Sequence, residues 1–141
     1  MIRGVERKSI PYVVEDDRSS SLESQTVFWV IPKTGEDNNK TLRRYASTYK
    51  DGRRGGREVD DRKLNAADVD EFLYLVEKVE NYGFPKDHKL YDSANDPIKE
   101  ITDKGGLIEV ARTLSADHLA EIFEVANNIS KLTEGAKKNS N

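Results

Sequence analysis

Six consecutive β-branched or aromatic residues, Thr26 to Ile31, constrain the fold of this chain more than any other segment. Residues of this kind favour extended backbone, and Pro32 ends the run because it has no N–H group to donate to a sheet. The sequence therefore predicts a strand at about residues 26–31. Its apolar side chains point to both faces, so we expect the chain's own helices or another subunit to cover both.

Apolar residues at helical spacing follow this strand. The spacing i, i+3, i+4, i+7 predicts helices over residues 41–49, 66–82, 107–114 and 116–132. Asn65 and Ser115 are suitable N-caps for the second and the last of these helices. The expected fold belongs to the α+β class: a mainly helical single domain with a small N-terminal β element and an amphipathic C-terminal helix.

The helix expected over residues 66–82 has the longest apolar stripe. The stripe consists of Val69, Phe72, Leu73, Val76, Val79 and Tyr82. Gly83 suits the position that follows a helix, and Pro85 cannot continue one. Residues 86–103 show no clear periodicity, and we expect them to be irregular, with a turn at residues 95–97 from which a helix can start at Pro97.

The length of 141 residues fits one domain, and equal shares of hydrophobic and charged residues, 35% each, limit that domain to a small core. We expect an N-terminal arm over residues 1–24, extended or looped, in which Ile10–Val14 can form a short edge strand. The α+β domain is expected to span residues 25–132, with a loop rich in glycine and arginine at 51–57. Residues 133–141 are predicted to be a polar C-terminal tail.

The titratable residues show no spacing typical of a catalytic or metal site. His88 and His118 are the only imidazoles, and no motif groups them with other ligands. The acidic runs Glu15–Asp17 and Asp60–Asp61 lack the alternating spacing of a calcium loop. The chain has no cysteine, which excludes thiolate nucleophiles and cysteine-based zinc sites. We therefore predict a protein that is not an enzyme, with no catalytic residue, no metal ligand and no cofactor.

The net charge of −3 does not favour binding to nucleic acid, which requires a strongly basic face. Arg53–Arg57 could contact phosphate, but Glu58 and Asp60–Asp61 follow directly, and this favours a solvated surface loop. No apolar run is long enough to span a membrane, and no apolar segment typical of a secretory signal follows the first charges. We expect an intracellular protein that does not bind membranes.

Contacts with partners are expected from two apolar elements. In the predicted strand Phe28 and Trp29 face opposite ways, so one joins the core while a helix or a partner covers the other. The last helix offers one apolar stripe, made of Leu119, Ile122, Phe123, Ala126 and Ile129. We predict that these seven residues bind partners.

The order of four segments resembles that of small tail assembly chaperones of long-tailed, siphophage-type bacteriophages and prophages. The segments are Glu15–Arg18, Gln25–Thr34, Val79–Tyr82 together with Phe84, and Leu119–Lys138. The likeness is a pattern of hydrophobic anchors, clearest at the two ends of the chain, rather than a catalytic motif.

This resemblance implies a function without catalysis. Proteins of the family bind the tape measure protein and tail tube components during tail assembly in the host cell cytoplasm, and they associate with themselves. We therefore expect the tape measure protein and the tail tube protein as partners, and a homo-oligomer. The alternative is a structural virion protein of the tail or of the head–tail connector.

Overall fold

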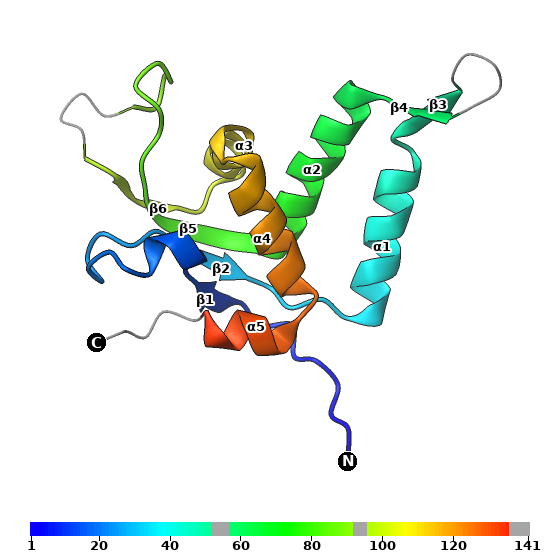
Figure 1. Cartoon of the computed structure of the whole chain (residues 1–141), viewed down its shortest axis with the longest axis horizontal. Helices are drawn as coiled ribbons and strands as arrows, with labels where there is room; N and C mark the ends of the chain where they lie inside the picture. The colour runs from blue at the N-terminus through cyan, green and yellow to red at the C-terminus, as the bar shows by residue number, and fades with distance from the viewer. Residues whose placement is uncertain (52–56, 92–95, 136–141) are drawn as a thin grey trace.

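The computed structural model describes residues 1–51, 57–91 and 96–135 (Figure 1). In chain order the elements are β1 (Ile10–Tyr12), a short 3-10 turn η1 (Glu15–Asp17), β2 (Val27–Val30), α1 (Gly35–Ala46), β3 (Tyr49–Asp51), β4 (Arg57–Val59), α2 (Asp61–Leu75), β5 (Val76–Tyr82), β6 (Ile98–Ile101), α3 (Lys104–Thr113), α4 (Ala116–Ala126) and α5 (Ile129–Glu134). Helices predominate in the described residues, and four of the strands form one antiparallel sheet, so the predicted α+β class is confirmed.

The strand predicted at residues 26–31 is present as β2, and it lies inside a sheet of order β1-β2-β5-β6. Phe28 is 2% exposed and joins the core, whereas the next residue, Trp29, is half-buried. The Trp29 Nε1 donates to Glu80 Oε1 at 2.8 Å, and the Lys78 ammonium lies 4.8 Å from the centre of its ring. Side chains of the neighbouring strand β5 therefore contact Trp29 on its face of the sheet.

One hydrophobic core joins the sheet to α2, α3, α4 and α5 (Figure 1). Its most deeply buried large side chains include Tyr12, Phe28, Phe72, Leu75, Ile122 and Leu132. They come from both ends of the chain and from its middle. The core therefore forms only when segments far apart in the sequence meet.

The prediction of a helix over residues 66–82 is wrong for residues 76–82. The helix α2 ends at Leu75, and Val76 already has extended backbone, with φ −112° and ψ 116°. Residues from Val76 onward form β5, which pairs with β2 on one side and β6 on the other. Valine is stiff at χ1 and packs well in a sheet, so its preference agrees with the strand once β2 is beside it.

The spacing of three residues between Val76 and Val79 has a structural cause in the strand. Val76 pairs with Val30, but Lys78 pairs with the preceding residue, Trp29, so β5 contains one extra residue, Glu77, at this point. Such a bulge places two valines three positions apart on the same face of the sheet. The sequence pattern therefore has a helical period although the backbone is extended.

Two helix starts differ from the sequence prediction. Asp60, and not Asn65, is the N-cap of α2, because its carboxylate accepts from the backbone N–H groups of Arg62 and Lys63. The helix expected over residues 41–49 begins earlier, at Gly35, where Thr34 and Asp37 form a capping box. Its expected apolar face does not reach the core, since Leu42 is 61% exposed.

The helix predicted over residues 116–132 is interrupted. Ser115 caps α4 as expected, accepting from the His118 N–H at 3.1 Å. The helix ends at Ala126, and Asn128 caps a new helix, α5, by accepting from the Lys131 N–H. Asparagine competes for backbone hydrogen bonds outside a helix, which explains a break at two successive asparagines.

Residues 86–103, predicted to be irregular, contain the edge strand β6, and Pro97 precedes this strand rather than a helix. The helix predicted over residues 107–114 begins earlier, at Lys104, with Asp103 as its N-cap. Part of the turn predicted at residues 95–97 and most of the loop predicted at 51–57 lie outside the described residues.

Strand β1 and the residues after it pack against the end of the last helix. The backbone N–H of Val13 donates to the carbonyl of Gly135 at 2.9 Å, and Tyr12 to Val14 are buried. Within the segment predicted as an N-terminal arm, β1 thus belongs to the sheet, and the predicted edge strand is present. Helix α5 continues to Glu134, inside the segment predicted as a polar tail.

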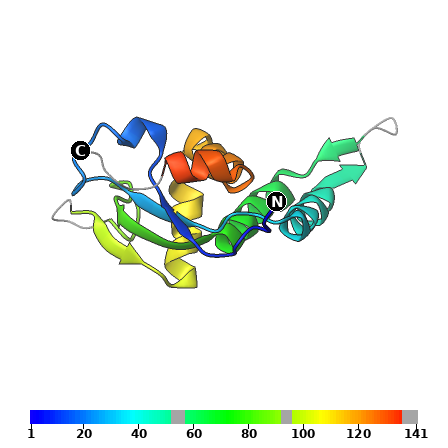
Figure 2. The same cartoon turned by 90° about the horizontal axis from the view of Figure 1, so that it is seen from below.

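A helical arm, which consists of α1, the β3–β4 hairpin and the first half of α2, extends away from the sheet (Figure 2). Tyr49 and Val59 pair across the hairpin and are 50% and 42% exposed. The Asp60 N–H donates to the Thr48 carbonyl at 2.7 Å and closes the base of the hairpin. The arm therefore carries exposed apolar side chains at the end remote from the sheet.

Candidate functional site

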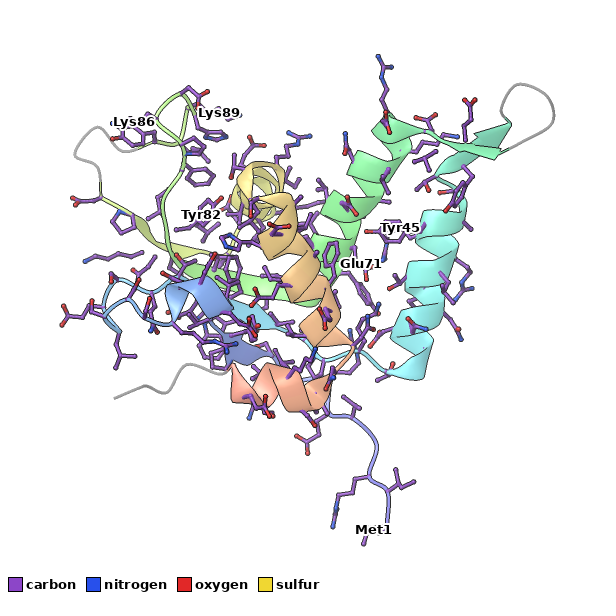
Figure 3. All side chains as sticks on the ribbon, viewed as in Figure 1. Met1, Tyr45, Glu71, Tyr82, Lys86 and Lys89 are labelled. Carbon is purple, nitrogen blue, oxygen red and sulfur yellow. The ribbon has the colours of Figure 1, made fainter. Side chains whose placement is uncertain are left out.

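A buried ionic cluster joins α1 to α2 at the base of the helical arm. Glu71 of α2 is 1% exposed and points toward α1 (Figure 3). Its carboxylate accepts from the Lys33 ammonium at 3.1 Å, from the Thr41 hydroxyl at 2.7 Å and from the Arg44 guanidinium. The Lys33 side chain is itself only 3% exposed. Because every partner is a donor, the cluster satisfies the buried carboxylate and sets the angle at which α1 leaves the sheet.

Asp37 extends this cluster at the first turn of α1. Burial opposes its ionisation, but hydrogen bonds from the Thr34 backbone N–H, the Tyr74 hydroxyl and the Arg7 guanidinium outweigh burial and hold the pKa of Asp37 well below its usual range. The Tyr74 ring also has three cations about its face, with Arg7, Lys40 and Arg44 between 5.4 and 5.6 Å from its centre. These contacts fix α1 on α2 and leave Asp37 charged.

Tyr45 makes a second link between the two helices. It points from α1 toward α2 (Figure 3), and its hydroxyl donates to the Asp68 carboxylate. Burial and this hydrogen bond raise the pKa of Tyr45, so the phenol stays protonated at any physiological pH. The link is structural, since a phenol of raised pKa does not serve as a base near neutrality.

Polar contacts also join β1 and the residues after it to α4. The Tyr12 hydroxyl donates to Glu121, whose carboxylate also accepts from the Glu15 N–H at 2.9 Å. Burial, followed by the bond to Glu121, raises the pKa of Tyr12. His118 contacts Asp16 at 2.8 Å on the same side. The acidic segment that the sequence singled out at residues 15–18 is therefore attached to α4.

The other histidine, His88, also contacts a carboxylate. His88 stacks on Phe84 and contacts Glu109 at 3.0 Å, and this hydrogen bond is the main cause that lowers the pKa of Glu109. Within residues 1–51, 57–91 and 96–135, no group of three or more His, Asp or Glu side chains is placed to hold a metal ion. Each imidazole pairs with a carboxylate.

An apolar groove runs between α2, α3 and the start of α4, with a volume of about 850 Å³. Its floor is formed by partly or fully buried aliphatic side chains: Val69, Leu73, Ile108, Ala111, Leu114 and Leu119. Exposed charged side chains form its rim: Arg62 and Asp70 on α2, and Lys104 and Arg112 on α3. An apolar floor with a charged rim is the usual form of a groove that receives an amphipathic segment.

The seven residues predicted to bind partners lie in different environments. Phe28, Ile122 and Ala126 are core residues, at most 2% exposed. Leu119 lines the groove. Phe123 and Trp29 are half-buried, and Phe123 packs against the core.

Ile129 is 45% exposed and lies apart from the α4 stripe, because the helix is interrupted at residues 127–128. It lines another hollow of about 550 Å³ beside Ile10 and Pro32. The residues of the expected single stripe are therefore divided between the core, the groove and the hollow beside Ile10 and Pro32.

The groove brings together residues that helical spacing places on the apolar faces of different predicted helices. Val69 and Leu73 belong to the stripe predicted for residues 66–82, and Leu114 to that of residues 107–114. Their spacing marks an apolar face but not whether the chain itself covers that face. Two small, exposed residues, Ala66 and Ala116, also line the groove. Their small side chains leave room above the floor of the groove, and this was the signal in the sequence.

Comparison with protein-family models, with curated proteins and with solved structures found no match to this chain. None of the helices in the described parts of the chain is long and apolar enough to cross a membrane.

Proposed function

We propose that this protein is a non-enzymatic tail assembly chaperone of a long-tailed bacteriophage or prophage. It binds the tape measure protein, together with tail tube components, during tail assembly in the host cell cytoplasm, and it associates with itself. The support from the sequence is the order of the four segments that resemble this family, from Glu15–Arg18 to Leu119–Lys138.

The apolar groove between α2, α3 and α4 is the observation that carries this proposal. A chaperone for a partner that later enters another assembly needs apolar surface that it can expose and cover reversibly. The floor of the groove supplies this surface, and its charged rim keeps the unoccupied protein compatible with water. The buried clusters around Glu71 and Tyr12 join α1 to α2 and β1 to α4, and α2 and α4 both line the groove.

Co-expression with the tape measure protein of the same phage tests the proposal. We expect a stable complex on affinity purification and a higher soluble fraction of the tape measure protein. Substitution A66E places a charge at the edge of the groove and should reduce both effects, whereas A46E, at an exposed position on α1, should leave them unchanged. The absence of a complex with the unmodified protein, with no gain in solubility, would refute the proposal.

A structural virion protein of the tail or the head–tail connector is the second candidate, and the helical arm favours it. Leu42, Tyr49 and Val59 are exposed on the arm, and permanent neighbours in an assembled particle would cover them. Mass spectrometry of purified virions separates the two candidates, since the structural protein remains in the particle and the chaperone does not.

A further inference from the structure

We propose that the outer edge of β6 binds an extended segment of a partner protein, which pairs antiparallel with β6 as an added strand of the sheet. The segment presents an acidic residue to Lys99, a basic residue to Glu100 and an apolar residue on each side of these two. The inference goes beyond the proposed function and does not rest on it, because it concerns the edge of the sheet and not the groove.

Strand β6 lies at one edge of the sheet and pairs with β5 alone (Figure 2, yellow-green). In an antiparallel strand alternate residues point their N–H and C=O groups away from the neighbouring strand. Among the described residues, no backbone hydrogen bond other than this ladder joins β6 to another segment. The outer side of β6 therefore offers backbone groups that an extended segment can pair with.

The opposite edge of the sheet, β1, is less suited to an added strand. Pro11 at the centre of β1 has no N–H group to donate. Directly after β1, the Val13 N–H already donates to the Gly135 carbonyl. Strand β6 contains no proline, and its Lys99 and Glu100 are exposed. The two edges thus differ, and β6 is the one that favours strand addition.

The charges of β6 indicate which residues the added strand carries. Glu100 lies directly opposite Glu80 of β5, and like charges in this position repel each other. The Glu80 carboxylate accepts from the neutral indole of Trp29, which does not compensate this charge. A basic residue beside Glu100 on the outer side offsets the repulsion. The exposed Lys99, which makes no ion pair within the described residues, favours an acidic residue in the same way.

A hollow of about 440 Å³ lies beside β6 and accounts for the apolar positions. Among the charged residues at the hollow, Asp103 already caps α3 and Glu109 already pairs with His88. This leaves one charge of each sign, Lys89 and Glu100. An added strand directs alternate side chains to one face, where a pocket can select them. The apolar lining of the hollow, which favours an apolar side chain there, consists of Phe84, Leu90, Ile98, Ile101 and Ile108.

A second copy of this chain matches the edge less well than a different segment does. Residues opposite each other in an antiparallel pair share a face of the sheet, so the twofold axis of a symmetric β6 pair passes between one residue and its own copy. Centring the pair on Lys99 or on Glu100 opposes two like charges. A segment of another sequence can place the opposite charge at both positions. The charge order of β6 therefore favours a different protein.

The test uses fluorescein-labelled designed peptides and the full chain. One peptide carries apolar–Lys–Glu–apolar at its centre, which matches β6 in antiparallel pairing, and a control peptide carries serine in place of both charges. Fluorescence anisotropy should detect saturable binding of both, with a Kd about two- to fivefold higher for the serine peptide, as expected for exposed ion pairs. The variant K99S/E100S should bind the two peptides equally. Equal binding by the unmodified protein would overturn the charge assignment.

Backbone pairing is tested with two further peptides, each N-methylated on one of the two sets of alternate residues. An N-methyl group removes the donor and blocks the approach of a strand on that side. Only one set faces β6 in a paired strand. One peptide should therefore bind at least about tenfold more weakly, and the other as the unmethylated peptide does. Equal binding of the two methylated peptides would overturn strand addition.

The hollow is tested at Leu90, which lines it and is 37% exposed. Substitution L90D should weaken peptide binding at least about threefold, since it places a charge against the apolar side chain of the added strand. The matched control L42D, at a side chain on α1 that is 61% exposed, should bind as the unmodified protein does. Circular dichroism should show the same helix content for all variants.

Three outcomes would overturn the inference. Unchanged binding by L90D would exclude the hollow from the site. The absence of saturable binding of either unmethylated peptide would refute strand addition at β6. Self-association in analytical ultracentrifugation that the peptide abolishes would assign the edge to a second copy.

Discussion

Glu71 shows how single residues determine the geometry of the helical arm. A carboxylate at 1% exposure, next to a lysine whose side chain is 3% exposed, is stable only while both charges keep their partners. The sequence gives no local reason to bury Glu71, which lies beside Phe72 in a helix rich in charges. The reason is tertiary, because Lys33 and Arg44 reach it from the segments before and within α1.

Substitution E71Q should lower the free energy of unfolding by about 3–5 kcal/mol, because it leaves Lys33 buried without a counter-charge. Urea denaturation followed by circular dichroism measures this loss. The control E36Q, at a side chain that is 81% exposed, should change stability by less than about 0.5 kcal/mol. A similar, small effect of both substitutions would show that the cluster does not hold α1 on α2.

The lowered pKa of Asp37 makes the stability of the folded protein depend on pH. Its pKa is lower in the folded protein than in the unfolded chain, where it is about 3.9. The stabilisation from its ionised form is therefore complete above the unfolded-state pKa and is lost as the pH falls toward the folded-state pKa.

The variant D37N should be less stable at pH 7 by about 1–3 kcal/mol, because Arg7 loses its ion pair and Tyr74 a charged acceptor. The difference between D37N and the unmodified protein should shrink as the pH falls below about 4. Urea denaturation at a series of pH values measures both quantities. A difference that does not vary with pH would contradict the assigned pKa shift.

At the scale of elements, α3 shows how close packing selects between two adjacent glycines. Both Gly105 and Gly106 lie in the first turn of the helix, after the cap Asp103. A β-carbon at Gly106 would lie 2.7 Å from Ile101 Cγ2, whereas one at Gly105 would meet Asp103 at an ordinary 3.5 Å. The small residue at Gly106 therefore permits α3 to approach the end of β6.

Substitution G106A should destabilise the protein by about 1–3 kcal/mol through this overlap, despite the better helix propensity of alanine. The matched change G105A should stabilise it by about 0.5–1 kcal/mol, because alanine loses less backbone entropy in a helix. Thermal unfolding of both variants provides the comparison. Equal stabilisation by the two changes would show that α3 does not pack this closely on β6.

At the scale of the whole molecule, the segment that follows β1 packs against the end of the last helix. Gly135, after the last helix, is buried, and a β-carbon there would lie 2.1 Å from the Tyr12 ring and 2.5 Å from the Arg18 guanidinium. Its carbonyl accepts from the Val13 N–H. The acidic segment at residues 15–18 and the C-terminal helices α4 and α5 therefore form one structural unit.

Substitution G135V should separate β1 from α5 and lower the free energy of unfolding by about 1–3 kcal/mol. The control is G4V, at a glycine with no neighbouring atom within 4 Å. Hydrogen exchange should become faster in β1 and α5 of G135V but not of G4V. Unchanged exchange in both elements would contradict the described packing of β1 and α5.

Sequence pattern alone determined the central strand at residues 26–31, the cap at Ser115 and the α+β class, because these depend on local propensity and on side-chain oxygens close in the chain. It placed Leu119 on the apolar stripe of the last helix, although not in the groove that this residue lines. Only the tertiary structure decided that residues 76–82 form a strand. A spacing of three fits both a helix and a bulged strand, and pairing with β2 settles which one forms. The same holds for Ile122 and Ala126, since periodicity identifies an apolar face, and only the packing of α4 on the core decides what covers it.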